Sequence, residues 1–179
     1  NLVWDFILPA LQEGPLPDDR EAQTLLKERL ASLALPVPAE KPDSPFASQI
    51  SGKRFVFEPG AGSYGSFKPI FTGDTCRAEL EMNGQKYIIP LGRGRWEKSE
   101  TRLAGPNILS RPGSPQSHKI AAAYEWSSDT TLEMIIRYIE SPHHIRVNCT
   151  FEGDTMVMHT RLSPPPGFDV PPVKAVMEK

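Results

Sequence analysis

Three glycines in residues 58–67, EPGAGSYGSF, have a spacing that can bring backbone amides close to a phosphate group: Gly60, Gly62 and Gly65. A dinucleotide-binding loop of this kind needs a helix directly after it, so that the phosphates meet the helix N-terminus. Residues 66–69, SFKP, are instead typical of a strand, and no kinase lysine, catalytic-loop or metal-site motif follows downstream. We therefore expect a glycine-rich hairpin turn rather than a nucleotide site.

Serine chemistry also lacks its usual surroundings. Around Ser63 the first glycine of a G-x-S-x-G nucleophile elbow is replaced by Ala61, and no serine has a lysine three residues later. Any hydrolytic serine must therefore lie outside this sequence.

The histidines and cysteines do not form a metal-binding pattern. His143 and His144 are adjacent in a predicted turn, where neighbouring side chains point in different directions, and no helical i, i+4 pair occurs. Cys76 and Cys149 match no metal or C-x-x-C spacing, and both fall at core-facing strand positions. We expect both cysteines to be small buried side chains, with a disulfide between them as the alternative. We expect no catalytic, cofactor-binding or metal-ligating residue in this chain.

Composition limits the classes of partner. The 179 residues are enough for one main domain with extensions. The formal charge of −2 creates no overall field that would attract nucleic acid or an anionic membrane. No apolar run approaches the roughly 20 residues of a membrane span, and no secretory signal is recognisable, so the compartment stays unassigned.

Residues 1–11 contain a single charge, Asp5, and predict a short helix that is apolar on most of its circumference. Such a helix is normally buried, either on this chain's own core or on a larger body. The chain opens with Asn rather than Met, which favours the larger body, and the contact residues would be Leu2, Trp4, Phe6 and Ile7.

A second helix is predicted after the turn at residues 14–17. Asp18 and Glu21 resemble a capping box, and leucines recur at helical spacing from Leu25 to Leu33. Residues 35–45 hold too many prolines to continue this helix and predict an extended linker.

From about residue 50 the apolar period changes from 3.6 to 2. Asn83-Gly84 between two alternating runs is a strong hairpin signal, and short turns join the later runs. Eight or nine such strands predict a mainly β fold, namely an antiparallel up-and-down, lipocalin-like barrel or a strongly curled sheet, preceded by two short helices. Trp96 and Trp126 are expected to be large plugs at the barrel ends, and the long loop 105–118 is expected either to lie across a mouth or to be mobile.

The predicted divisions are a terminal helix of an upstream domain (1–14), the amphipathic helix with a Pro-rich linker (15–48), the barrel (49–163) and a Pro-rich C-terminal tail (164–179). Six polar residues would share the face opposite the apolar rows: Glu133, Arg137, Arg146, Asn148, His159 and Arg161. They form either a solvated outer face or, alternatively, a charged partner patch or a ligand lining.

Several segments in order, among them WDFILPAL, ISGKRFVFEP, LGRGRW and TLEMIIRYIESPHHIRVNCTFEGDTM, resemble the C-terminal region of bacterial serine hydrolases related to beta-lactamases and penicillin-binding proteins. In that family a lipocalin-like barrel follows the catalytic domain. The resemblance runs with gaps from Trp4 to about Met158, and the family's S-x-x-K and tyrosine motifs match no position here.

The resemblance implies a non-catalytic accessory domain that packs on a serine-hydrolase catalytic domain and shapes access to it or its stability. The residues themselves leave a second function open, which is a barrel that binds a small apolar ligand. A free-standing hydrolase is the third alternative.

Overall fold

The computed structural model describes the chain except for residues 12–13, 15–16, 40–42, 106–116, 164 and 166–169. Two compact units are present, Asn1–Pro36 and Val37–Lys179. Most of the predicted long loop at residues 105–118 lies outside the described residues.

The first unit consists of short helices. A π-helical turn, η1 (Val3–Ile7), continues into a 3-10 turn, η2 (Leu8–Ala10), and α1 (Arg20–Ser32) follows. The predicted cap is wrong by one residue: Asp19, not Asp18, accepts the Ala22 amide hydrogen at 2.9 Å. Asp18 instead accepts a bond from the Gln23 side chain, because it lies one residue too early to reach the first-turn amides.

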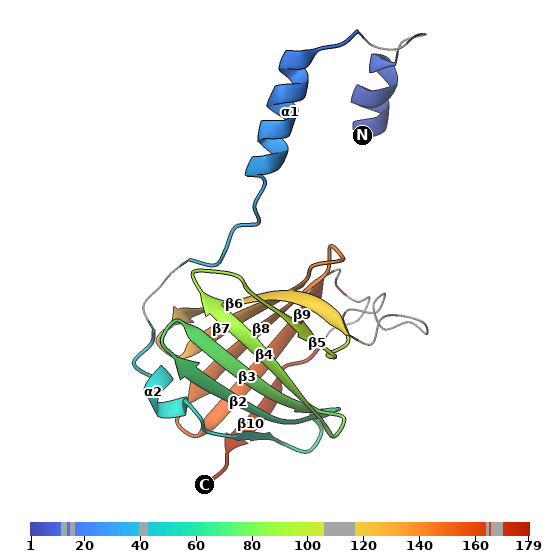
Figure 1. Cartoon of the computed structure of the whole chain (residues 1–179). Coiled ribbons are helices and arrows are strands. Elements are labelled where there is room, and N and C mark those ends of the chain that lie inside the picture. The colour runs from blue at the N-terminus through green and yellow to red at the C-terminus, as the bar shows by residue number, and fades with distance from the viewer. Residues whose placement is uncertain (12–13, 15–16, 40–42, 106–116, 164, 166–169) are drawn as a thin grey trace. The chain divides into compact units, whose positions relative to one another are not determined.

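The second unit is a β-barrel with one short helix, α2 (Ala47–Ile50), next to β2 (Figure 1). Its strands are β1 (Phe55–Phe57), β2 (Tyr64–Thr72), β3 (Thr75–Met82), β4 (Gln85–Arg93), β5 (Glu97–Thr101), β6 (His118–Ser128), β7 (Thr131–Tyr138), β8 (His144–Glu152), β9 (Thr155–Ser163) and β10 (Val173–Met177).

The strands follow the order β4-β3-β2-β1-β10-β9-β8-β7-β6-β5, and β4 also pairs with β6. That last pairing is parallel, with Gly92 opposite Ala123 and Arg93 opposite Tyr124, and it closes the ring, whereas the other pairings are antiparallel. β5 pairs with an earlier stretch of β6. The predicted lipocalin-like barrel is therefore confirmed, but its sheet has ten strands in the described part of the chain rather than the expected eight or nine, and the β4–β6 pairing departs from the expected antiparallel arrangement.

The predicted boundary at residue 163 is wrong. Residues 173–177 are not part of a tail outside the barrel but form β10, which lies between β1 and β9. Ala175 is fully buried and pairs with Phe57 on one side and Met156 on the other. The prolines before this strand hid it in the sequence, because a five-residue strand carries little periodic signal of its own.

Two turns have the backbone that the sequence predicts. Asn83 and Gly84 both have positive φ, 54° and 70°, as the tight hairpin between β3 and β4 requires. Gly60 and Gly62, at φ 99° and 64°, lie in the turn between β1 and β2. The glycine-rich segment is thus a strand–turn–strand connection, as expected.

The core lies inside the barrel and is built from alternate residues of its strands. Trp126 belongs to it and is 4% exposed, as predicted for a plug at one end. The corresponding prediction for Trp96 is wrong, because its ring lies outside the core cluster with the Arg137 guanidinium 5.5 Å from its centroid. No helix within the described part of the chain is long and apolar enough to cross a bilayer.

Candidate ligand-binding site

The two halves of the barrel interior leave a space between them toward one end. Alternate residues of β2, β3 and β4 face alternate residues of β7, β8 and β9, since each strand turns every second side chain inward. The space has a volume of about 180 Å³ and is partly open to solvent. Its lining consists of Tyr64, Phe67, Ala78, Leu80, Met82, Ile89, Leu91, Leu103, Ala104, Gly105, Met134, Ile136, Ile145, Val147, Met158, Thr160 and Leu162.

The lining is apolar apart from two side-chain hydroxyls. The Tyr64 hydroxyl lies 3.4 Å from Thr160 Oγ1, and either oxygen can be the donor. The Tyr64 ring also packs beside Phe57, with centroids 5.3 Å apart. No Asp, Glu, Lys, Arg or His side chain is among the described residues that line this cavity.

The segment that contains Leu103 is fixed against the barrel. The buried Tyr138 hydroxyl donates a hydrogen bond to the Leu103 carbonyl oxygen at 3.2 Å, and the Leu103 amide donates one to Thr101 Oγ1 at 3.1 Å. Burial raises the pKa of Tyr138 well above its usual value, so the hydroxyl keeps its proton at neutral pH. Leu103 is 6% exposed and covers part of the cavity.

The opposite end of the interior is filled by aromatic rings. Phe151 lies at the centre, with ring centroids 5.4 Å from Phe55, 5.9 Å from Phe46 and 6.2 Å from Trp126. Ile50 of α2 is completely buried in the same core cluster. Space for a ligand therefore remains at one end.

One ion pair and one hydrogen bond hold the linker against this filled end. Arg93 Nη1 lies 2.7 Å from Asp43 Oδ2, and the Tyr124 hydroxyl donates a hydrogen bond to Asp43 Oδ1 at 3.2 Å. Burial, followed by the charge of Asp43, raises the pKa of Tyr124 well above its normal value. The Asp43 contacts therefore position the chain before α2. Neither Asp43 nor Arg93 is among the residues that line the cavity.

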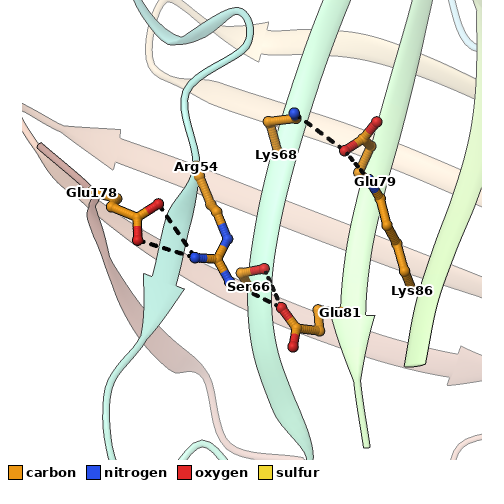
Figure 2. Close-up of polar contacts among 7 residues, drawn as sticks. All are labelled: Arg54, Ser66, Lys68, Glu79, Glu81, Lys86 and Glu178. Atoms are coloured by element: carbon orange, nitrogen blue, oxygen red, sulfur yellow. Dashed lines mark hydrogen bonds and ion pairs between the residues drawn. The ribbon is translucent and has the colours of Figure 1, made fainter. Parts of the chain in front are cut away.

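The outer face of β2, β3 and β4 carries the charges that the interior lacks (Figure 2). Glu79 is only 7% exposed and receives Lys86 at 2.7 Å, Arg77 at 2.8 Å and Lys68 at 3.3 Å. The hydrogen bond from Lys86 is the main reason that the pKa of Glu79 is lowered.

A second outer group lies beside it. Arg54 contacts Glu81 at 3.0 Å and Glu178 at 3.1 Å, and Ser66 donates to Glu81 at 2.9 Å (Figure 2). The hollow between the two groups has a volume of about 290 Å³. Its cations are matched by carboxylates, so we assign it no anion-binding role.

The six polar residues predicted to face away from the apolar rows do so. Glu133 pairs in register with Asn148, Arg146 with Arg161, and Asn148 with His159, while their strand neighbours Leu132 and Met134 are buried inside. Arg146 forms an ion pair with Glu133. This is an outer face, so these residues are not a ligand lining.

His118, His143 and His144 have different surroundings. His143 lies in a turn with its Nδ1 2.9 Å from the Ser163 carbonyl oxygen, and His118 packs edge-on against Tyr138 at 5.5 Å. Desolvation, followed by the nearby Arg137 and Arg146, lowers the pKa of His144. Across the described residues, no group of three or more His, Cys, Asp or Glu side chains could hold a metal ion.

Cys76 and Cys149 are free thiols and are both completely buried, as the strand pattern predicts. Burial raises the pKa of the Cys76 thiol to about 12 and that of Cys149 further. Both side chains are therefore protonated packing groups rather than nucleophiles.

The described residues of the helical unit Asn1–Pro36 form no core of their own. None of the residues of η1, η2 or α1 is buried. Leu2, Trp4 and Phe6 are 71%, 66% and 69% exposed, and Ile7 is 48% exposed.

The sequence does not single out the two cavity hydroxyls. Tyr64 lies in the glycine-rich turn region, and Thr160 is one of several threonines in strands, so neither has a local signal. Side chains alternate between the two faces of a strand, and Met156 and Met158 of β9 face inward. Only this alternation, continued by two residues, places Thr160 on the inner face.

No protein-family model matches the chain, and no curated protein matches it either. Among solved structures, one similar chain is described as a secretary abundant heat soluble (SAHS) protein from Ramazzottius varieornatus. The identity is 11%, the match covers 79% of this chain and 99% of that chain, and the TM-score is 0.48. A likeness at this level gives no information about a ligand or partner.

Proposed function

We propose that the barrel binds one small apolar molecule in the cavity bounded by β2–β4 and β7–β9. The observation that supports this function best is the cavity itself, which is apolar, partly open and about 180 Å³ in volume. An apolar cavity of about 150 Å³ stays dry and takes up benzene, whereas drug-sized pockets begin near 300 Å³. The ligand is therefore about the size of one aromatic ring or a short alkyl chain.

The energetics also favour an occupant. Apolar lining surface that a ligand removes from water contributes roughly 25 cal/mol per Å² to binding. A bound apolar molecule would recover dispersion contacts with lining residues such as Met134 and Met158.

Thermal unfolding with a series of small ligands tests this proposal. Toluene and indole, added near saturation, are expected to raise Tm by roughly 5 °C, because a ligand at about 100 times its Kd contributes about 2.7 kcal/mol. Ala78→Phe and Met82→Trp fill the cavity from two positions of β3 and are expected to abolish the shift. Val56→Phe, on the outer face of β1, is the matched control and should keep it.

Two outcomes would count against ligand binding. Absence of any shift with the unmodified protein across ring and alkyl compounds overturns the proposal. A shift that persists in both filling variants places the binding elsewhere and overturns it equally.

We also propose a second function, as an accessory domain of a beta-lactamase-related serine hydrolase that packs through the helix at residues 1–11. The exposure of Leu2, Trp4 and Phe6 within a unit that has no buried residue in its helices supports this. Exposed apolar surface of this kind marks an interaction site. The order of sequence segments described above supports the choice of partner.

The coding sequence upstream of Asn1 provides the first test, and an S-x-x-K stretch there is the expected result. If that stretch is present, Trp4 fluorescence should shift to shorter wavelength when this chain is mixed with the catalytic domain, because the indole leaves water. Trp4→Ala and Phe6→Ala should weaken the association, and Leu25→Ala on α1 is the control. Ester or beta-lactam hydrolysis by this chain alone, surviving replacement of Ser63, would contradict an accessory role.

A further inference from the structure

We propose that the cavity selects a neutral amphipathic molecule, such as a short-chain alcohol, over the ionised carboxylate of the same length. Its one polar group would bind the Tyr64 and Thr160 hydroxyls. This inference rests on the proposed ligand-binding function and names the ligand class for that same cavity.

The two hydroxyls provide a polar position in an otherwise apolar lining. They come from β2 and β9, which are separated by β1 and β10 in the sheet, and their oxygens lie 3.4 Å apart. A good O–H···O bond measures about 2.5–3.0 Å, so this contact is long and the hydrogen bond between the two hydroxyls is weak. Each hydroxyl has one hydrogen to donate and lone pairs to accept, so the pair can bind a ligand hydroxyl or carbonyl placed between them.

No lining side chain offers a compensating charge. The described lining holds neither a cation nor an acid, and the Lys68, Arg77 and Lys86 cations gather around Glu79 on the outer face of the sheet. An ionised carboxylate that enters such a site loses its hydration without gaining an ion pair, which is strongly unfavourable. A neutral hydroxyl loses far less and regains hydrogen bonds.

The same reasoning gives a pH signature for acidic ligands. A carboxylic acid buried in apolar surroundings favours its protonated form. A short fatty acid should therefore bind mainly as the neutral acid, and its apparent affinity should rise as the pH falls toward its own pKa. The affinity of the matching alcohol should not change over that range.

Calorimetric titration with hexan-1-ol, hexanoate and toluene distinguishes the cases. At about pH 7 we expect hexan-1-ol to bind at least about tenfold more tightly than hexanoate, and hexanoate to gain affinity toward about pH 5. The double variant Tyr64→Phe, Thr160→Val should lose about tenfold in hexan-1-ol affinity and keep its toluene affinity. Tyr87→Phe and Thr150→Val, which remove hydroxyls outside the lining, are the matched controls.

Equal affinity for the alcohol and the carboxylate in the unmodified protein would overturn the selectivity, because the head group would then lie in solvent. Unchanged hexan-1-ol affinity in the double variant would overturn the role of the two hydroxyls. In both cases toluene binding would leave the proposed ligand-binding function standing. Failure of toluene and hexan-1-ol alike to bind would instead refute that function itself.

Discussion

Phe55 lies opposite Met177 in the antiparallel pair of β1 and β10, although 122 positions separate them in the chain (177 − 55). On its other side, β10 pairs with β9. The barrel is thus completed by a strand at residues 173–177 that follows a proline-rich stretch, and its stability depends on that strand.

Removal of residues 173–179 should abolish cooperative unfolding. The deletion leaves β1 and β9 with unpaired edges and removes the fully buried Ala175, which is severe for a domain stabilised by only about 5–15 kcal/mol. Urea unfolding followed by circular dichroism measures the effect. Removal of residues 178–179 alone loses the exposed ion pair of Arg54 with Glu178 and the hydrogen bond from the Glu178 amide to the Arg54 carbonyl oxygen at 2.8 Å, and should cost only about 1–2 kcal/mol.

Phe151→Ala should destabilise the barrel by about 3–5 kcal/mol. The Phe151 side chain is 1% exposed and holds the rings of Phe46, Phe55 and Trp126 around it, so its loss leaves a cavity at the filled end. Chemical denaturation gives the difference in the free energy of unfolding. Val157→Ala, at an exposed position of β9, should stay within about 0.5 kcal/mol, and a similar cost for both substitutions would argue against the aromatic cluster.

Glu79→Gln should destabilise the folded state by about 1–2 kcal/mol near pH 7, because three cations would lose their common carboxylate. Interactions with the cations lower the pKa of Glu79, so its contribution is complete above the unfolded value of about 4.5 and is lost as the pH falls below that value through the lowered folded pKa. The variant should therefore lose less stability in acid than the unmodified protein does.

A pH series of urea midpoints gives this comparison. Glu58→Gln serves as the control, since Glu58 lies 3.6 Å from Lys174 with both side chains about half exposed, and it should change stability by less than about 0.5 kcal/mol. Identical acid profiles for Glu79→Gln and the unmodified protein would contradict the assigned role.

Cys76 and Cys149 should react with a thiol reagent only when the barrel unfolds. Burial raises the pKa of the Cys76 thiol from 9.0 to about 12, so almost no thiolate is present at pH 8. Since the unfolded thiol ionises first, stability should fall as the pH rises above about 9, and Cys76→Ala should reduce that fall. Ellman's reagent, with and without urea, follows the reaction, and rapid labelling of the native protein would contradict the burial.

Local patterns in the sequence determined several elements of the fold. Alternation of apolar and polar residues predicted most of the strands and their inner faces, though not β10, and Asn83-Gly84 predicted a hairpin, because both signals act over a few neighbouring residues. The buried state of Cys76 and Cys149 followed from the same alternation. The exclusion of a dinucleotide-binding loop at Gly60 depended on the strand-like residues directly after it, and the exclusion of a kinase-type loop depended on the absence of kinase motifs downstream.

Only the tertiary structure decided how the barrel closes and where it stays hollow. The pairing of β10 with β1, the parallel contact of β4 with β6, and the approach of Tyr64 to Thr160 join residues that are far apart in the chain. Trp96 and Trp126 have the same chemistry, yet one lies outside the core and the other within it. Closure depends on the register of all strands together, and packing depends on the volumes of all inward-facing side chains. A short stretch of sequence contains only a few of these residues, so it cannot predict either property.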